Sequence, residues 1–243
     1  MSLKVNILSP HIDDAAYGLT LHISSFIKSE VPLTLINCFT VTRWTAIPVE
    51  SKEVKDVMLL RETEDNQFNS FFNSAIKIIN LNLLDAPLRN GYIFQTMPFE
   101  AIEWEMVEKL KNYLEENITG ILLCPLGIGN HIDHAICREA VEQIYRKIKV
   151  VFYEDLPYAA RISQEAIFDH VKELETKLNI QLGSHIHSVQ NCSIDKELAV
   201  RIYKSQMNDT ICSEIISHMN SLSGERLWGE QEVLESLVKV LRC

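Results

Sequence analysis

Apolar and polar residues alternate in blocks along the chain as far as about residue 155. Short apolar runs predict buried strands, and longer stretches with apolar side chains three and four positions apart predict helices. Strands are expected at about 3–9, Pro32–Phe39, Ile76–Leu83, Gly120–Pro125 and Lys149–Tyr153, and helices at about 14–29, Lys52–Ser74, Phe99–Asn117 and 132–147. Such alternation is typical of parallel sheets covered on both faces. We therefore predict an α/β fold, a Rossmann-like three-layer α/β/α arrangement with a mostly parallel sheet.

The pattern is weaker in the last third of the chain. After Pro157 it indicates a helix at about 163–179, a strand near 180–189, and helices at about 195–206 and 209–221. No repeat, low-complexity segment or linker interrupts the sequence, which predicts a single domain over residues 1–243. The segment 41–51 mixes Thr, Trp, Pro and charged residues and is expected to be a loop.

Composition narrows the expected partners. The 243 residues are 47% hydrophobic and 23% charged, with a formal net charge of −10, and an acidic chain without a basic block disfavours binding to nucleic acid. No apolar run approaches the roughly 18 residues of a membrane helix, and the first residues lack the pattern of a signal peptide. We therefore expect a cytoplasmic protein without membrane insertion. Its six widely spaced cysteines are expected to be reduced, which disfavours a thiolate zinc site.

Histidine and aspartate residues are concentrated at the ends of two predicted strands. His11–Asp14 (His-Ile-Asp-Asp) follows the first strand, and His131–His134 (His-Ile-Asp-His) follows the fourth. Each cluster leads into a predicted helix. Because ligands of open α/β sheets bind at the carboxyl ends of the strands, the two clusters are expected to face one crevice.

These residue types suit a divalent metal. His11 and Asp14 are three positions apart at a strand-to-helix turn, and either His131 or His134 could supply a third ligand. Two histidines and one carboxylate with open positions are typical of catalytic zinc, and also of non-haem ferrous iron. The carboxylate and histidine that remain would serve as a general base and a polarising or acidic imidazole, which predicts metal-assisted hydrolysis.

Each cluster also has a structural interpretation. Asp13 or Asp14 is a favourable N-cap for the following helix, and Asp133 is favourable at a helix start. The occurrence of both clusters at the ends of parallel strands favours the functional interpretation. The Gly127-x-Gly129 turn lacks the third glycine of a dinucleotide-binding loop, so we interpret it as a turn close to the metal pocket.

The two motifs together resemble those of the PIG-L/LmbE-like family of zinc-dependent de-N-acetylases. They are Ser-Pro-His-Ile-Asp-Asp-Ala at residues 9–15 and Pro-Leu-Gly-Ile-Gly-Asn-His-Ile-Asp-His at residues 125–134. The family usually has Ala-His-Pro-Asp-Asp-Glu first, so the chain departs at Pro10, Ile12 and Ala15 and resembles a Ser-Pro-His-x-Asp-Asp-Ala branch. Weaker matches at 60–65, 84–89 and 153–158 extend the resemblance from residue 3 to about residue 160.

The resemblance implies a role for each residue of the two motifs. The residues that match the metal ligands, with Zn²⁺ as cofactor, are His11, Asp14 and His134. Asp13 matches the general base that activates the attacking water, and His131 matches the imidazole that stabilises the oxyanion or protonates the leaving amine. Asp133 would hold a histidine in its useful tautomer.

The candidate substrate-binding residues are Arg61, Arg89 and Glu154. Arg61 could equally form an exposed helix salt bridge with Asp65. Arg89 lies in a strand-end loop suited to an anionic or polyol group, while Glu154 and its neighbour Asp155 could instead cap the backbone or make structural hydrogen bonds. Trp44, in the 41–51 loop, could stack on a sugar or simply pack within the loop.

We therefore expect a zinc-dependent hydrolase that removes an N-acetyl or short N-acyl group from a small amide, an amino-sugar or glycosylated metabolite. A zinc amidase for non-sugar amides and a catalytically silent carbohydrate-binding protein of the same fold are the alternatives. The expected partner is a small-molecule N-acylated substrate, and the oligomeric state, including a homo-oligomer, is left open. The metal site requires the imidazoles of His11 and His134 to lie within about 6 Å, because zinc–nitrogen bonds are about 2 Å long.

Overall fold

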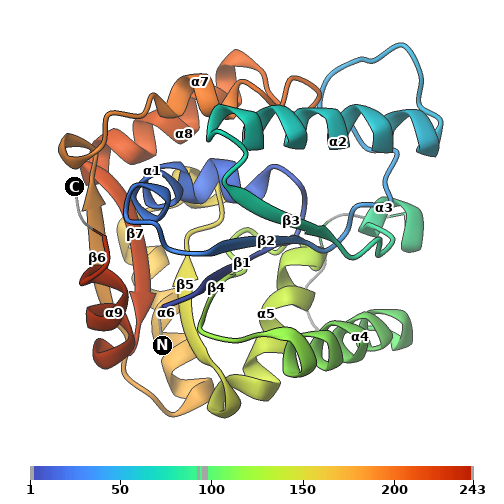
Figure 1. The fold of residues 1–243 in the computed structure, drawn as a ribbon. Coiled ribbons are helices and arrows are strands. Elements are labelled where there is room, and N and C mark those ends of the chain that lie inside the picture. Colours follow the sequence, from blue (N-terminus) through green and yellow to red (C-terminus); the bar gives the residue numbers. More distant parts are fainter. Residues whose placement is uncertain (1–2, 92–93, 95–97, 242–243) are drawn as a thin grey trace.

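A seven-stranded mixed sheet forms the centre of the computed structural model, which describes residues 3–91, 94 and 98–241 (Figure 1). Its strands are β1 (Val5–Ser9), β2 (Leu33–Asn37), β3 (Ile76–Asn80), β4 (Ile121–Pro125), β5 (Lys149–Tyr153), β6 (Gly183–Ser188) and β7 (Gly224–Gly229). Their spatial order is β3-β2-β1-β4-β5-β7-β6. The predicted α/β fold with a mostly parallel sheet is confirmed.

Strands β1 to β5 are parallel, and β1 lies between β2 and β4. Val5 pairs in register with Leu33 on one side and Ile121 on the other. All residues of β1 and β4 are buried, as expected for strands covered on both faces, in which continuous apolar runs replace alternation. Because the two strands run in the same direction, Ser9 and Pro125 end at one edge and deliver the two histidine–aspartate clusters there.

Helices cover both sides of the sheet. The α-helices are α1 (Asp14–Lys28), α2 (Val54–Phe71), α3 (Ala86–Arg89), α4 (Ala101–Asn117), α5 (Ile132–Ile144), α6 (Gln164–Leu178), α7 (Lys196–Val200), α8 (Asp209–Leu222) and α9 (Gln231–Val238), and the short 3-10 helices are η1 (Tyr145–Lys147), η2 (Tyr158–Arg161) and η3 (Val189–Asn191). Figure 1 shows α1, α2, α7 and α8 on one side and α4 and α5 on the other. Their buried apolar side chains and those of the sheet form one contiguous core.

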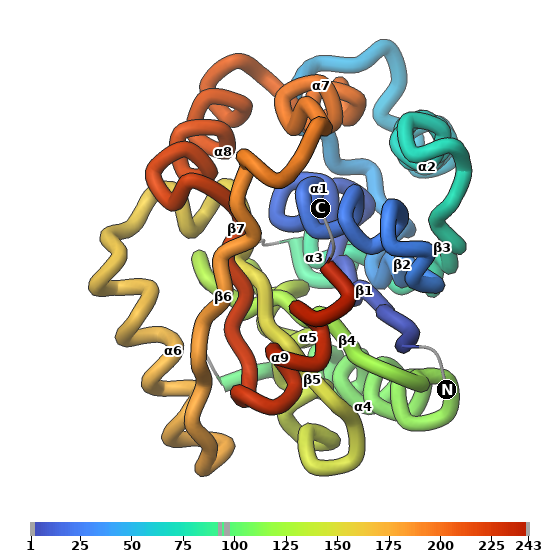
Figure 2. Tube along the Cα trace, turned by 60° about the vertical axis from the view of Figure 1, so that its left-hand side comes forward, coloured from blue at the N-terminus to red at the C-terminus, as the bar shows by residue number. Residues whose placement is uncertain are grey.

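The C-terminal third differs most from the sequence-based expectations. The hydropathy pattern predicts neither α9 nor β7, although β7 pairs antiparallel with both β5 and β6. Figure 2 shows the chain folding back so that β7 lies between these two strands. The sequence of β7, Gly-Glu-Arg-Leu-Trp-Gly, is wholly buried but carries two charges, so its burial depends on ion pairs that hydropathy does not reveal.

The helix expected at 195–206 ends early, at Val200. The following residues leave the helical path, and Ser205 donates two hydrogen bonds to Glu64 on α2. The tertiary contact therefore overrides the local helical pattern. Among the residues that the structure describes, no helix has the length and apolar character needed to cross a lipid bilayer.

Candidate active site

The turn after β1 places His11 and Asp14 side by side. Ser9 Oγ accepts a hydrogen bond from the backbone N–H of Ala15 (3.1 Å) and donates one to the carbonyl of His11 (2.6 Å). The N–H of His11 donates to Asp14 Oδ2 (2.7 Å). The polar residue at the strand end thus closes the turn, and both predicted ligands face the same edge of the sheet.

The turn after β4 positions the second cluster in a similar way. His131 is the N-cap of α5, with extended backbone angles, and its Nδ1 accepts a hydrogen bond from the N–H of Asp133 (3.2 Å). His134 then falls in the first helical turn, with its side chain only 1% exposed. Asp13 occupies the N-cap position of α1 but makes no capping hydrogen bond, so its carboxylate is not used by the helix.

His11, Asp14 and His134 form a compact group of donor atoms, all within 4.8 Å of one another. Asp14 Oδ2 lies 3.2 Å from His11 Nδ1 and 3.3 Å from His134 Nε2. Ligand atoms about 2.0–2.1 Å from a tetrahedral zinc ion are about 3.3 Å apart, so these separations fit a zinc donor set. The ring centroids of His11 and His134 are 5.3 Å apart, within the required limit of about 6 Å.

His11 also belongs to a second group of potential ligands, with His131 and Asp133. His11 Nε2 lies 3.0 Å from Asp133 Oδ2, which also accepts the N–H of Ala86 (3.0 Å), while Oδ1 accepts from Arg89 (2.7 Å). A carboxylate held this firmly is the acceptor for His11 Nε2–H, which leaves Nδ1 facing Asp14 as the ligand atom. In this arrangement Asp133 orients His11.

Asp155, at the end of β5, does the same for His134. His134 Nδ1 lies 2.6 Å from Asp155 Oδ1, and Asp155 Oδ2 accepts a hydrogen bond from the N–H of Ile128 (3.0 Å). A carboxylate behind a metal-binding histidine fixes the tautomer and makes the facing nitrogen a better ligand. Ile128 belongs to the Gly127–Gly129 turn, so that turn lies beside the candidate metal site.

Charge in the site is divided unevenly among the histidines. Burial opposes a charge on His11, but hydrogen bonds to Asp133 and Asp14 outweigh burial and raise its pKa to about 9. Burial likewise opposes a charge on His134, yet Asp14 raises its pKa well above the ordinary value. Burial and the neighbouring His11 lower the pKa of His131 well below its ordinary value. The carboxylates therefore favour positive charge at His11 and His134. A divalent cation bound between these residues would supply positive charge at the same place.

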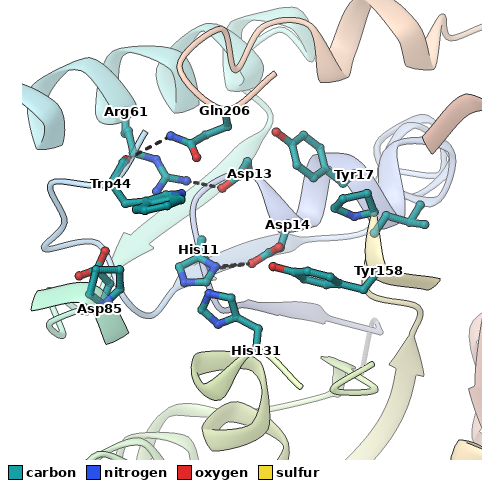
Figure 3. Close-up of a pocket in the computed structure, with 13 residues that line it drawn as sticks. His11, Asp13, Asp14, Tyr17, Trp44, Arg61, Asp85, His131, Tyr158 and Gln206 are labelled. Atoms are coloured by element: carbon teal, nitrogen blue, oxygen red, sulfur yellow. Dashed lines mark hydrogen bonds and ion pairs between the residues drawn. The ribbon is translucent and has the colours of Figure 1, made fainter. Parts of the chain in front are cut away.

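A cavity adjoins this group, and Figure 3 shows how its walls are built. Asp13 lies on one wall and forms an ion pair with Arg61 of α2, with both side chains largely buried. Figure 3 shows Asp13, Arg61 and Gln206 on one side of His11 and His131 on the other. A carboxylate and an imidazole thus flank the candidate metal-binding group, an arrangement suited to acid–base chemistry at a bound substrate.

The structure brings Arg61 to the cavity but places Arg89 elsewhere. The guanidinium of Arg89 is fully buried, donates to Asp133 Oδ1 (2.7 Å) and lies 3.8 Å from Glu103. It is not among the described residues that line the cavity. Arg89 therefore lies behind Asp133, and its position supports a role in holding Asp133 rather than the expected contact with substrate.

Glu154 also lies away from the cavity. Its carboxylate accepts hydrogen bonds from Arg226 Nε (2.5 Å) and Trp228 Nε1 (3.0 Å) and lies 2.7 Å from His218 Nε2. This buried network joins the segment after β5 to β7 and α8, and it supports a structural role for Glu154 rather than the expected contact with substrate. Glu154 and Asp155 both follow the last residue of β5, yet only Asp155 contacts a candidate metal ligand.

Helix α1, several loops and the C-terminal third supply lining residues that the two motifs do not include. They are Tyr17, Trp44, Asp85, Tyr158 and Gln206. The indole of Trp44, which the sequence places in a loop, lines the cavity and is 47% exposed. Gln206 is far from either motif in the sequence, so no local pattern could have assigned it to the cavity.

Comparison with known proteins adds independent evidence. No protein-family model matches the chain. Its sequence is 24% identical to 2'-N-acetylparomamine deacetylase from Streptomyces fradiae over 223 residues, which cover 87% of this chain and 76% of that protein. The N,N'-diacetylchitobiose deacetylase from Pyrococcus horikoshii is 16% identical, with a TM-score of 0.51 over 90% of this chain and 76% of that chain.

Higher structural similarity is found with deacetylases of teicoplanin biosynthesis. A deacetylase–teicoplanin complex is 18% identical, with a TM-score of 0.66 over 93% of this chain and 97% of that chain. The zinc-inhibited form of teicoplanin deacetylase has the same identity and coverage and a TM-score of 0.64. The predicted relationship to deacetylases is confirmed, and the structural matches establish a shared fold, while the particular sequence branch stays a prediction.

Proposed function

We propose that this protein is a zinc-dependent N-deacetylase that hydrolyses an acetamide, or another short N-acyl amide, on a small molecule. One observation carries the proposal. The donor atoms of His11, Asp14 and His134 have the separations of a zinc site, and Asp13 and His131 lie beside them and line the same cavity. The deacetylase relatives support the same reaction class.

The three ligand residues would hold zinc, which supplies Lewis-acid polarisation of a carbonyl and lowers the pKa of water towards about 7. Asp13 is the proposed general base, because its carboxylate lines the cavity and caps no helix. Arg61 pairs with that carboxylate and holds it in place on the cavity wall. Asp13 takes up the proton of the attacking water, and the proton is then available for the departing amine.

His131 is suited to stabilise negative charge on the carbonyl oxygen. Its low pKa keeps the ring neutral, and its Nδ1 accepts the N–H of Asp133, so the ring proton resides on Nε2. A neutral Nε2–H is a hydrogen-bond donor that can strengthen as the oxyanion forms. This favours the oxyanion role for His131 over delivery of a proton to the amine.

We infer that the substrate is an amino-sugar or a glycosylated metabolite. The relatives named for acetylparomamine, teicoplanin and diacetylchitobiose support this class. The half-exposed indole of Trp44 at the cavity also suits the apolar face of a sugar ring. We further propose that the whole chain is one domain of Rossmann-like three-layer architecture, since helices lie on both sides of one sheet and one core joins them.

The test is a hydrolysis screen on protein purified without chelator, with zinc content measured by mass spectrometry. N-acetylglucosamine, N-acetylglucosaminyl glycosides and N-acetylated aminoglycosides are compared with N-acyl amino acids, and released acetate is quantified. The proposal expects one zinc per chain and acetate release from the sugar substrates. Hydrolysis of the N-acyl amino acids alone would indicate an amidase, and stoichiometric zinc with sugar binding but no hydrolysis would indicate a silent binding protein.

A further inference from the structure

Helix α2 contributes two buried charged residues, one helical turn apart, on the face nearest the cavity. Arg61 pairs with Asp13 on the cavity wall. Glu64, which is 3% exposed, is not among the described residues that line the cavity. Its carboxylate is instead hydrogen-bonded to Ser205, which is far away in the sequence.

Both carboxylate oxygens of Glu64 are used by one residue. Glu64 Oε1 accepts the backbone N–H of Ser205 (2.7 Å), and Oε2 accepts the Ser205 hydroxyl (2.7 Å). Both hydrogen bonds are buried. Hydrogen bonds to an ionised carboxylate are stronger than neutral ones, and two of them to one residue fix its orientation as well as its position.

Ser205 in turn holds the loop that carries Trp44. The carbonyl of Ser205 accepts the N–H groups of Ala46 (2.9 Å) and Ile47 (3.3 Å). Gln206 Nε2 donates to the carbonyl of Trp44 (3.3 Å), and Figure 3 shows this contact above the cavity. We call Trp44–Ile47 together with Ser205–Gln206 the rim.

The rim reaches the site through Trp44 and Gln206, which both line the cavity. The indole of Trp44 is half-exposed, so its place depends largely on how its backbone is held. The N-terminal side of the loop is held separately, because the N–H of Trp44 donates a hydrogen bond to the hydroxyl of Thr42 (2.8 Å). Glu64 is the anchor on the side of the C-terminal segment.

We propose that Glu64 is a positioning residue that holds the rim over the cavity and thereby sets the affinity for substrate. The inference rests on the proposed function, since Trp44 and Gln206 are taken to face the substrate. Without the Glu64 anchor, binding has to order the rim, and this cost in conformational freedom weakens binding. Asp13, Arg61 and the metal ligands keep their own contacts, so the chemical step is largely unchanged.

The test compares Glu64→Ala and Glu64→Gln with a control, Glu62→Ala, on the exposed side of the same helix. We expect KM to rise about tenfold in Glu64→Ala and less in Glu64→Gln, which keeps one acceptor, with kcat within about twofold. Limited trypsin digestion supplies a readout independent of activity. Cleavage after the exposed Arg43 or Lys52, which flank the rim loop, should be faster in Glu64→Ala and unchanged in the control.

An unchanged KM together with an unchanged cleavage rate would overturn the proposal, as would a loss of kcat at constant KM. If Glu64→Ala does not fold, Glu64→Gln and Ser205→Ala carry the same comparison, because each removes part of the anchor. A wild-type protein inactive on every amide would defeat the proposed function alone. Faster cleavage in the Glu64 variants would then still support the anchoring of the rim.

Discussion

Asp155 Oδ1 lies 2.6 Å from Nδ1 of His134, and both side chains are buried. The opposite nitrogen of the same ring faces Asp14 at 3.3 Å. Asp155 therefore stands directly behind a candidate metal ligand and decides which nitrogen of His134 is free to bind. A residue just after β5 thus contacts a candidate site whose proposed ligands follow β1 and β4.

Asp155→Asn should weaken zinc binding about 10- to 100-fold, because an amide cannot fix the tautomer of His134 as a carboxylate does. The measurement is competition for zinc with a calibrated chelator. Asp169→Asn, at an exposed position of α6, is the control and should bind zinc like the wild type. Equal zinc affinity of the two variants would show that Asp155 does not orient the ligand.

Asp13 and Asp14 are adjacent in sequence but should differ in function. Asp13→Ala should keep one zinc per chain and lose at least about 100-fold in kcat, because the proton acceptor is removed. Asp14→Ala should lose both zinc and activity. Zinc content and kcat are measured on the same preparations, and near-normal hydrolysis by Asp13→Ala would disprove its assignment as the base.

Glu154→Gln should destabilise the fold without loss of zinc. The substitution removes the negative charge that pairs with the buried Arg226 guanidinium, and breaking such a pair costs about 3 kcal/mol. Urea unfolding gives the change in free energy, with Glu173→Gln on the exposed face of α6 as control. A variant of wild-type stability with a raised KM would instead return Glu154 to the substrate-binding role.

Asp65 should make a measurable contribution to stability that depends on pH. Burial raises its pKa to about 6, against 3.8 for an ordinary aspartate, although Tyr203 and Asn37 donate hydrogen bonds to it. Between these two values the folded chain binds a proton that the unfolded chain does not, so stability rises as the pH falls. Relative to Asp65→Asn, the wild type should gain on the order of 2 kcal/mol between pH 7 and pH 4.

Unfolding free energies of both proteins across that pH range provide the test. Contributions shared by the two chains cancel in the difference, so the other carboxylates do not obscure the result. A constant difference would mean that Asp65 titrates alike in the folded and unfolded chains.

Much of the sheet and the position of the two histidine–aspartate turns could be predicted from local sequence. The apolar runs of β1 and β4 are buried on both faces, so continuous hydrophobicity marks them clearly. The histidine–aspartate clusters follow those strands directly, and parallel strands end at one edge. Their position at one edge therefore follows from the parallel direction of the strands. The pairing of β1 with β4, which the structure shows, brings the rings of His11 and His134 to 5.3 Å.

Only the tertiary structure could decide what each remaining polar residue does. Glu154 and Asp155 are adjacent after the same strand, and Arg61 and Arg89 are both candidate substrate-binding residues in the sequence. Even so, Arg89 and Glu154 lie in buried networks, whereas Arg61 and Asp155 reach the candidate site. Their partners come from segments distant in the sequence.

The chain alone thus determined the parallel α/β core and the two turns that carry the candidate metal ligands, because hydrophobic burial and strand ends are local properties. Only the tertiary structure decided the antiparallel β7, the rim, and which carboxylates lie at the candidate site and which in buried networks. The reason is that the role of a buried charge depends on the distant group that neutralises it.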